Sequence, residues 1–331
     1  MNKKYTLGII GVRGYVGREL LALLANHRDI QVDWVSSRQL EGSPLSDLLG
    51  KDQSFKFSGL SAEHHYRQVT IENLTAEMVA KQNTDIIVLA LPNGLAEPFV
   101  KALEDAAKSL LVIDLSADYR FTDDWIYSVP ELLNLEKLSL HTVSGPIKIS
   151  NPGCYATAMQ IALAPLVKHI QGRVNCFGIS GYSGAGTTPS ANNDPDKLKD
   201  NILPYGLIEH LHEKEVSYQL NMPISFSPHV AEFFRGISMT VQLELTESWT
   251  LDSIQKHFKC FYANDVGIKV TDSIPNIQQV INSNNCLVGG FKLSEDGKRL
   301  SFVSCLDNLL KGAASQALQN INLVLDNRKS T

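Results

Sequence analysis

Short apolar runs alternate with amphipathic stretches through the first half of the chain. The runs have the composition of strands buried on both faces of a sheet, and they cover residues 7–11, 30–35, 85–90 and 110–115. Helical periodicity follows the first run at 18–24 and the third at 95–107. Strands that alternate with helices predict a parallel, doubly wound α/β sheet.

The pattern changes beyond residue 150. A helical stripe covers 158–166, and strand-like segments, several of them alternating between apolar and polar residues, follow at 175–181, 223–226, 237–245, 286–291 and 300–305. This pattern predicts an open mixed or antiparallel sheet with one face on helices. A last helix is expected over 307–323, and because it is rich in small residues we expect it to pack closely, back on the first domain.

Composition narrows the class of protein. At 331 residues, the chain is long enough for two domains with separate cores. A net charge of −5 without a Lys/Arg cluster argues against nucleic-acid binding. No apolar run reaches the roughly 18 residues of a transmembrane helix, and residues 1–5 lack a signal-peptide pattern. The five cysteines are widely spaced, so we expect no disulfide framework, no metal site and a cytoplasmic location.

The turn after the first predicted strand carries three glycines. Gly11, Gly14 and Gly17 form a G-x-x-G-x-x-G pattern rather than the common G-x-G-x-x-G. Glycines at a strand-to-helix turn let backbone N–H groups approach a pyrophosphate at the helix N-terminus. The pattern favours a dinucleotide site over the alternative of a plain turn. The expected site also includes Arg13, Tyr15 and Val16.

Residues at the ends of the next predicted strands indicate which dinucleotide cofactor to expect. The second strand ends without the acidic residue that usually binds the ribose hydroxyls of NAD. Ser36, Ser37 and Arg38 stand there instead and suit the 2′-phosphate of NADP(H), although a solvated loop explains them equally well. Pro92 follows the third strand, at an edge where open α/β sheets bind ligands, so we assign it to the cofactor site.

Two further segments leave alternatives open. Arg120 follows the fourth predicted strand, where it either holds an anionic group of a substrate or pairs with Asp118. The glycine-rich segment 181–188 is predicted to be an irregular loop, which either wraps a phosphate or cofactor or only connects two elements.

Cys154 lies in a turn-and-helix segment near the middle of the chain. Pro152 and Gly153 form a turn, and the helical stripe begins directly behind it, so Cys154 is at or beside a helix N-terminus. Unpaired N–H groups and the helix dipole favour the thiolate there, which is the nucleophilic form. The alternative is a small buried cysteine in a turn. The other four cysteines are interpreted as structural.

A histidine pair completes the set of candidate residues. His210 and His212 lie two residues apart beside several acids. They lack a third ligand at the spacing of a zinc site. Taken alone, they are best interpreted as surface histidines.

Two motifs connect these features. Asn-Pro-Gly-Cys-Tyr-Ala-Thr (151–157) before a helix and Asp-Asn-Leu-Leu-Lys-Gly-Ala-Ala (307–314) resemble those of the N-acetyl-gamma-glutamyl-phosphate reductases of arginine biosynthesis, relatives of aspartate-semialdehyde dehydrogenase. The resemblance covers nearly the whole chain. The chain departs from the family at 210–216, which lacks the usual proline, and at 11–14, where Gly-Val-Arg-Gly replaces Gly-Ala-Ser-Gly.

The resemblance implies an architecture and a reaction. It implies a Rossmann NADP(H) domain of residues 1–150 plus 308–331, and an α/β mixed-sheet substrate and oligomerisation domain of residues 151–307. It also implies an acyl phosphate substrate and a homodimer or homotetramer. Cys154 would be the nucleophile that forms a thioester, with either His210 or His212 as the acid/base. Further implied residues are Ser183, Gly184 and Asn308 for the cofactor and Ser116, Arg120, Asn151 and Tyr182 for the substrate.

Other functions share some of these features. A reductase of another acyl phosphate, such as aspartyl phosphate, would use the same residues and differ in substrate. A non-catalytic NADP(H) sensor would leave Cys154 unreactive at neutral pH. A cysteine hydrolase or acyltransferase would need no nicotinamide, so tight NADPH binding that protects the thiol would exclude it.

Overall fold

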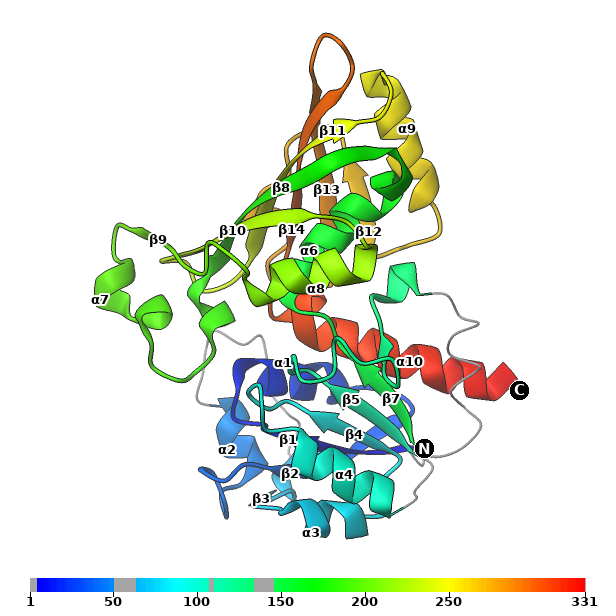
Figure 1. Ribbon diagram of the computed structural model, residues 1–331. Coiled ribbons are helices and arrows are strands. Elements are labelled where there is room, and N and C mark those ends of the chain that lie inside the picture. Colours follow the sequence, from blue (N-terminus) through cyan, green and yellow to red (C-terminus); the bar gives the residue numbers. More distant parts are fainter. Residues whose placement is uncertain (1–4, 51–63, 107–109, 134–145, 331) are drawn as a thin grey trace. The chain divides into compact units, whose positions relative to one another are not determined.

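A computed structural model describes residues 5–50, 64–106, 110–133 and 146–330 (Figure 1). The chain forms two compact units. Unit 1 combines residues 1–152 with 313–331, and unit 2 consists of residues 153–312. Each unit has its own seven-stranded sheet.

The sheet of unit 1 is parallel throughout its described pairings, as the sequence predicted. Its strand order is β3-β2-β1-β4-β5-β7-β6. The strands are β1 (Tyr5–Ile10), β2 (Ile30–Ser36), β3 (Ile71–Glu72), β4 (Ile86–Leu89), β5 (Leu111–Asp114), β6 (Ile126–Tyr127) and β7 (Ile147–Ser150). The order runs outward in both directions from β1 and β4, and ligands bind at such a switch point, at the carboxyl ends of the strands.

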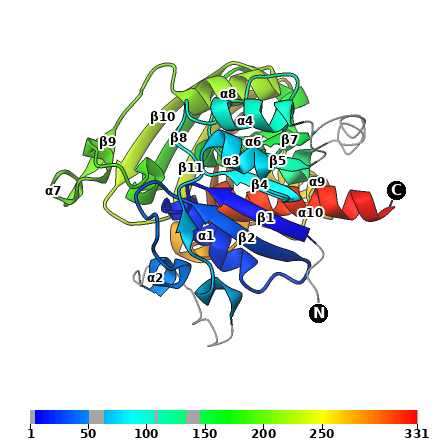
Figure 2. The same ribbon diagram turned by 90° about the horizontal axis from the view of Figure 1, so that it is seen from below.

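Helices cover both faces of this sheet (Figures 1 and 2). The α-helices of unit 1 are α1 (Tyr15–Leu24), α2 (Leu45–Gly50), α3 (Ala76–Lys81), α4 (Glu97–Asp105) and α10 (Ser315–Ser330), and the short 3-10 helices are His65–Arg67 and Pro130–Leu132. Leu7 and Ile9 of β1 pack with α1 and α10, whereas Ile10 packs with α3 and α4. Successive side chains of a strand point to opposite faces, so one apolar run supplies both cores.

The C-terminal helix begins later than its periodicity predicted. A π-helical turn over Leu310–Ala314 precedes α10, and Asp307 and Asn308 lie outside both elements. The Asp307 carboxylate accepts hydrogen bonds from the N–H groups of Leu309 and Leu310, which closes a turn in place of the expected first helical turn. Within unit 1, α10 packs on the core through Ala317 and Ile321.

The sheet of unit 2 is mixed, again as predicted. Its strand order is β12-β13-β14-β11-β8-β10-β9, with parallel pairing only for β8 with β10 and β12 with β13 among the described pairs. The strands are β8 (Ile170–Gly181), β9 (Ile202–Pro204), β10 (Ile224–Ala231), β11 (Ile237–Leu245), β12 (Ile268–Thr271), β13 (Cys286–Leu293) and β14 (Arg299–Leu306). The helices are α6 (Cys154–Leu163), α7 (Pro195–Leu198), α8 (Leu211–Leu220) and α9 (Leu251–Phe261), with 3-10 turns at Ala164–His169, Tyr182–Ala185, Ala191–Asn193 and Ile277–Gln279.

Helix α6 is the central helix of unit 2. Residues 155–163 are all buried, and the helix contacts β11, β14 and α8. Along β8, buried Val174 and Cys176 alternate with exposed Asn175 and Phe177, so one face of the sheet is covered and the other is open.

The cysteines follow this layering with one exception. Cys176, Cys286 and Cys305 are buried, as expected for structural residues. Cys260 is exposed, which does not fit its interpretation as a structural residue. The reason is that α9 buries Ile254 and Phe258, and Cys260 falls outside that stripe. Within the described part of the chain, no helix is both long and apolar enough to cross a membrane.

Candidate active site

The three glycines of the β1–α1 turn have three different surroundings. Gly11 has a φ of +89°, and a Cβ there would lie 2.1 Å from the carbonyl oxygen of Ala90. A Cβ on Gly17 would lie 2.9 Å from the Cα of Val12, so this glycine allows α1 to pack on the turn. Gly14 is the N-cap of α1, and the nearest atom to a Cβ there is 3.6 Å away. This turn therefore leaves room at the N-terminal amides of α1, as a pyrophosphate site requires.

The end of β2 contributes one exposed cation beside this turn. The backbone oxygen of Ser36 accepts hydrogen bonds from the N–H groups of Gly11 and Val12, which fixes the strand end to the glycine turn. The Ser36 hydroxyl accepts from the N–H of Leu74, and Ser37 is buried. Arg38 is exposed. Of the three residues predicted to bind a 2′-phosphate, Ser36 and Ser37 are buried and Arg38 is exposed.

The ends of β4 and β5 are joined by Asp118. Its carboxylate accepts hydrogen bonds from the N–H groups of Gly94 (2.6 Å) and Ala96 (3.1 Å), in the turn before α4. Pro92 lies in the same turn and is exposed. Arg120 is 6% exposed, and its guanidinium donates to the backbone oxygens of Asn151 and Leu115.

A buried polar network brings three predicted substrate residues together in unit 1. Ser116 donates its backbone N–H and its hydroxyl to Asp114, whose pKa is raised to about 6 by burial. The N–H of Asn151 donates to the backbone oxygen of Asp114, and Arg120 reaches the backbone oxygen of Asn151. The side-chain oxygen of Asn151 accepts from Asn320 of α10. Ser116, Arg120 and Asn151 are therefore held by the fold at the ends of β5 and β7.

In unit 2, Cys154 is the first residue of α6. The N-cap, Gly153, donates its N–H to the Oε1 of Glu215 at 2.9 Å. Glu215 lies on α8 and is fully buried. It is not among the residues that the sequence patterns single out. It lies three residues after His212 on the same helix, a spacing that places both side chains on one face. This spacing from a candidate histidine is the signal in the sequence that could have pointed to Glu215.

His210 begins the neighbouring helix α8. It is the N-cap, and its Nδ1 accepts a hydrogen bond from the N–H of His212 at 3.1 Å. Because Nδ1 is an acceptor, the proton of the neutral ring is on Nε2. The ring packs between Tyr205 and Phe226, and a Cβ on Gly206 would lie 2.9 Å from it. Burial lowers the pKa of His210, opposed in part by the charge of Glu213.

Two tyrosines connect Cys154 with the histidines. Burial raises the pKa of Tyr155 and of Tyr205, and the negative charge of Cys154 raises both further. The ring centroid of Tyr155 is 5.9 Å from that of His212, and that of Tyr205 is 5.5 Å from that of His210. The Tyr155 hydroxyl donates to the backbone oxygen of His229 at 2.6 Å. Tyr155, the residue after Cys154, thus packs near His212, and Tyr205, whose pKa responds to Cys154, packs near His210, so Tyr205 joins the candidate residues.

The segment predicted to be an irregular loop at 181–188 contains a 3-10 turn, Tyr182–Ala185. The N–H groups of Tyr182 and Ser183 donate to the backbone oxygens of Phe233 and Phe234, which is why the turn is regular despite its glycines. Asn308 donates its side-chain N–H to the hydroxyl of Ser183 at 2.9 Å. Gly184 is exposed beside them, so three residues predicted to bind the cofactor are neighbours in unit 2.

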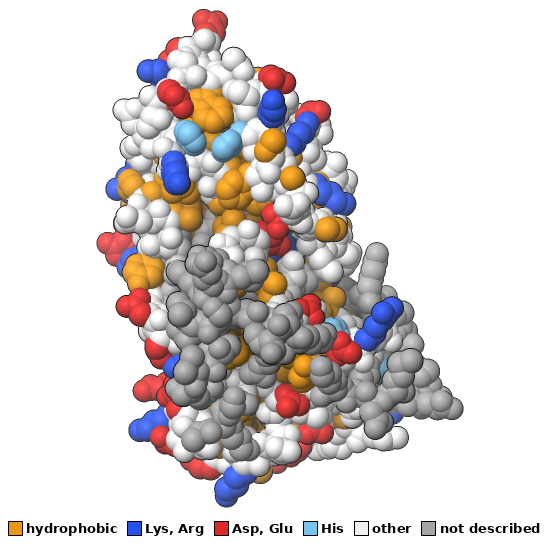
Figure 3. All heavy atoms as spheres, turned by 90° about the vertical axis from the view of Figure 1, so that its right-hand side faces the viewer, with side chains coloured by type: hydrophobic (Ala, Val, Ile, Leu, Met, Phe, Trp, Pro, Cys, Tyr) orange, Lys and Arg blue, Asp and Glu red, His pale blue; other side chains and the backbone are white. Residues whose placement is uncertain are grey.

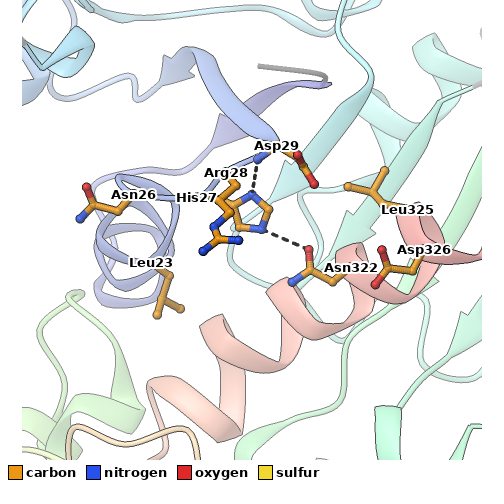
Figure 4. A pocket seen from close by; sticks show the side chains of 8 residues that line it. All are labelled: Leu23, Asn26, His27, Arg28, Asp29, Asn322, Leu325 and Asp326. Carbon is orange, nitrogen blue, oxygen red and sulfur yellow. Dashed lines mark hydrogen bonds between the residues drawn. The ribbon is translucent and has the colours of Figure 1, made fainter. Parts of the chain in front are cut away.

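A pocket of about 410 Å³ in unit 1 lies away from the glycine turn (Figure 4). It is at the opposite end of α1, where residues 26–29 face Asn322, Leu325 and Asp326 of α10. The Nδ1 of His27 accepts from the N–H groups of Asp29 and Ile30, and its Nε2 lies 3.2 Å from the side-chain oxygen of Asn322. His27 therefore ties the turn after α1 to α10, and the pocket contains none of the predicted site residues.

Histidines elsewhere in unit 2 pack against aromatic rings. His169 and His257 contact Trp249, with ring centroids 5.0 and 5.4 Å away. Figure 3 shows two histidine side chains beside a hydrophobic one on one face of the protein. Among the described residues, no group of three or more His, Cys, Asp or Glu side chains is arranged to hold a metal ion.

Comparison with known proteins places this geometry in a class. Residues 6–141 match the NAD binding domain of semialdehyde dehydrogenases, and residues 154–308 match their dimerisation domain. Aspartate semialdehyde dehydrogenase II from Vibrio cholerae has the same fold, with a TM-score of 0.74, 18% identity and coverage of 98% of this chain and 99% of that one. The aspartate semialdehyde dehydrogenase from Candida albicans, solved with NADP, has a TM-score of 0.75 and 17% identity, and the match covers 97% of this chain and 98% of that one. The chain has the two-domain architecture of a semialdehyde dehydrogenase, with an NAD(P)-binding domain.

Similarity in sequence is much higher to one branch of this class. The N-acetyl-gamma-glutamyl-phosphate reductase of Xanthomonas euvesicatoria is 46% identical over 323 residues, which are 97% of this chain and 95% of that protein. The Stenotrophomonas maltophilia reductase is 47% identical over 321 residues, with the same coverage. The chain belongs to the N-acetyl-gamma-glutamyl-phosphate reductase family, as its two motifs indicated.

Proposed function

We propose that the chain reduces N-acetyl-gamma-glutamyl phosphate with NADPH, releasing phosphate and N-acetylglutamate semialdehyde, as a step of arginine biosynthesis. The observation that carries this proposal is Cys154 at the N-terminus of α6, linked to His210 through Tyr205, in a chain 46% identical to reductases of this name. An acyl phosphate needs a nucleophile that converts it to an ester which hydride can reduce, and a cysteine thiolate supplies one.

In the first step, the Cys154 sulfur attacks the acyl carbon. A carbon–sulfur bond forms, the carbon–oxygen bond to the phosphate breaks, and phosphate leaves. The amide groups at the start of α6 stabilise the thiolate and the oxyanion. Glu215 supports this arrangement because it holds the Gly153 N–H at the N-cap. Cys154 reacts as the thiolate, so no proton has to be removed in this step. Neutral His210 carries its proton on Nε2 because Nδ1 accepts from the N–H of His212, and this Nε2–H can donate to the developing oxyanion. Its lowered pKa favours this neutral ring at pH 7.

In the second step, the thioester is reduced and released. A nicotinamide cofactor, when bound, would supply the hydride that reduces the thioester carbon. The carbon–sulfur bond then breaks, the aldehyde leaves and Cys154 returns as a thiolate. The Nε2–H of His210 can donate a hydrogen bond to the oxygen of the tetrahedral thiohemiacetal before that oxygen becomes the aldehyde carbonyl. We assign this role to His210 rather than His212 because the Nδ1 of His210 accepts from the backbone of α8, which leaves its Nε2–H as a hydrogen-bond donor.

We propose NADP(H) rather than NAD(H) as the cofactor. The residues fit a dinucleotide, because Gly14 leaves space at the N-terminus of α1 and Gly11 allows the sharp turn before it. Exposed Arg38 at the end of β2 suits a 2′-phosphate, and no acidic side chain occupies residues 36–38. The Candida albicans relative solved with NADP supports the same choice.

We also propose that the chain forms a homodimer through unit 2. The match to a dimerisation domain supports this, and the open face of the mixed sheet provides a surface. Phe177 on that face is 42% exposed and contacts the ring of His229, at 4.4 Å between centroids. A second copy would cover these side chains. Sedimentation of a Phe177→Glu variant tests this, with the monomer as the expected species and an unchanged dimer as the contrary result.

The reaction is tested in reverse. NADP+ reduction is followed with N-acetylglutamate semialdehyde and phosphate, for the wild type and Cys154→Ala. Phosphate-dependent NADPH formation that the substitution abolishes is the expected result. Activity with aspartate semialdehyde alone would keep the mechanism but change the substrate, and no activity with either would overturn the proposal.

A further inference from the structure

The turn after β14 contains a buried ion pair that the proposed reaction does not use. Asp307 is fully buried, and its Oδ2 lies 2.9 Å from the Nε of Arg235. The same oxygen accepts from the N–H of Asn282, while Oδ1 accepts from the N–H groups of Leu309 and Leu310. One carboxylate therefore sets the path of the chain as it leaves the sheet.

Arg235 belongs to a different turn, the one between β10 and β11. Its side chain is 7% exposed, and NH1 donates to the side-chain oxygen of Asn282 at 2.8 Å. The next residue, Gly236, donates its N–H to the side-chain oxygen of Asn308 at 2.7 Å. The two turns are thus joined twice, by the ion pair and by the amide of Asn308.

The turn after β14 contacts the nucleophile, Cys154, through Gly312. The N–H of Gly312 donates to the backbone oxygen of Asp307 at 2.9 Å, within the π-helical turn. A Cβ on Gly312 would lie 2.7 Å from the Cβ of Cys154 and 3.2 Å from its Cα. The backbone of Gly312 is therefore packed directly on Cys154. π-Helical turns of this kind often occur at functional sites.

We propose that Arg235 and Asp307 are positioning residues for Cys154: their ion pair fixes the turn that holds Gly312 against the nucleophile. The inference rests on the proposed function, in which Cys154 attacks the substrate. Neither residue needs to touch substrate or cofactor. An error of about 1 Å in the position of a reacting group costs on the order of 100-fold in rate, so a rigid support is valuable here.

The test uses the full chain with Cys260→Ser, because Cys260 is exposed and would also react with a thiol reagent. The variants are Arg235→Met, which removes the charge, Arg235→Lys, which restores it, and Gly312→Ala, which keeps the ion pair but crowds Cys154. Gly289→Ala is the matched control, because its Cβ would meet the backbone of Thr271 rather than Cys154. Each variant is measured for kcat, for KM and for the rate of Cys154 alkylation by iodoacetamide across pH.

We expect Arg235→Met and Gly312→Ala to lower kcat by about 30- to 100-fold with a KM change below about 3-fold. Alkylation should slow about 10-fold with its pH midpoint moved upward, since the thiolate loses its place at the helix N-terminus. Arg235→Lys should recover most of the rate. A merely structural role would lower the melting temperature without moving the alkylation profile.

If Arg235→Met does not fold, Asp307→Asn replaces it, since the amide can still accept from Leu309 and Leu310. Folded variants that match Gly289→Ala in kcat and in alkylation would overturn the inference. Alkylation needs no turnover, so a wild type without phosphate-dependent activity would reject the proposed function and still leave the support of Cys154 measurable.

Discussion

The glycine turn of unit 1 and the cysteine site of unit 2 both lie where a turn leads into a helix, but they are built from different material. The glycine turn is contiguous, and its function depends on backbone conformation and on the absence of side chains at Gly11, Gly14 and Gly17. The cysteine site collects side chains from several segments, with Cys154 on α6, His210 and Glu215 on α8, and Gly312 after β14.

The two sites should therefore fail in different ways. A change in the glycine turn acts on the local backbone, and its effect is on cofactor binding and on the stability of unit 1. A change in the cysteine site acts on the position and charge of a few atoms, and its effect is on the rate of the chemical steps. The following predictions test that difference, in order of decreasing expected effect.

His210→Asn should have the largest effect on rate. Asparagine still caps α8, so the helix should remain, while the acid/base is lost and kcat falls by about 100- to 10,000-fold. In the wild type, the lowered pKa of His210 places the acidic limb of kcat/KM below the ordinary histidine value of 6.5, with activity lost as pH falls. Steady-state kinetics across pH checks both statements. A larger loss in His212→Asn would reverse the assignment.

Gly11→Ala should disrupt the glycine turn of unit 1 and with it cofactor binding. The new Cβ meets the oxygen of Ala90 at a φ of +89°, so we expect a loss of about 2–4 kcal/mol in unfolding free energy and more than about 100-fold in NADPH affinity. Denaturant unfolding and fluorescence titration measure the two. Gly14→Ala is the control, because its Cβ would make only an ordinary contact, 3.6 Å from the oxygen of Gly11, and it should weaken NADPH binding with little change in stability. Equal free energies of unfolding for Gly11→Ala and Gly14→Ala would contradict the view that this turn depends on the backbone conformation of Gly11.

Glu215→Ala should lower kcat by about 30-fold or more and leave NADPH affinity unchanged. It removes the partner of the Gly153 N–H, and an unsatisfied buried donor costs about 1–3 kcal/mol in stability. Glu215→Gln keeps an acceptor, so it separates the hydrogen bond from the charge. Glu213→Gln on the same helix is the matched control, since Glu213 accepts from the N–H of Phe226. Equal losses of kcat in Glu215→Ala and Glu213→Gln would indicate a general disturbance of α8 rather than loss of the hydrogen bond to the Gly153 N–H.

Arg38→Gln should have the smallest effect. Losing one charge-assisted contact to a 2′-phosphate should weaken NADPH binding by about 10-fold and leave NADH binding unchanged. Arg28, exposed at the opposite end of α1, provides a control of the same type that should change neither affinity. Competition binding with the two cofactors measures the difference. A parallel loss for NADPH and NADH would remove Arg38 from the 2′-phosphate site.

The sequence was informative wherever the determining contacts are local. Apolar runs alternating with helical stripes predicted the parallel sheet of unit 1, and the change to alternating strands predicted the mixed sheet of unit 2. The turn before Cys154 predicted a helix N-terminus, because Pro152, Gly153 and the following stripe are neighbours in the chain. The two motifs also identified the family, since they are contiguous.

Contacts between distant segments were beyond such patterns. Sequence patterns left the choice between His210 and His212 open, and only the fold shows that one of them caps α8 through its Nδ1. Glu215 was missed because its partner, the N–H of Gly153, lies 62 residues away. The start of the last helix was misplaced because the Asp307 carboxylate, paired with Arg235, forms a turn where periodicity predicted a helix.

The sequence by itself therefore determined the class of fold, the nucleophile candidate and the family, since each depends on residues within a helical turn or a strand of one another. The tertiary structure alone decided which histidine has a fixed tautomer, which carboxylate holds the N-cap of α6 and which glycine packs on Cys154. The physical reason is that hydrogen bonds and close contacts depend on distances of a few ångströms. Residues far apart in the chain reach those distances only through the packing of whole elements.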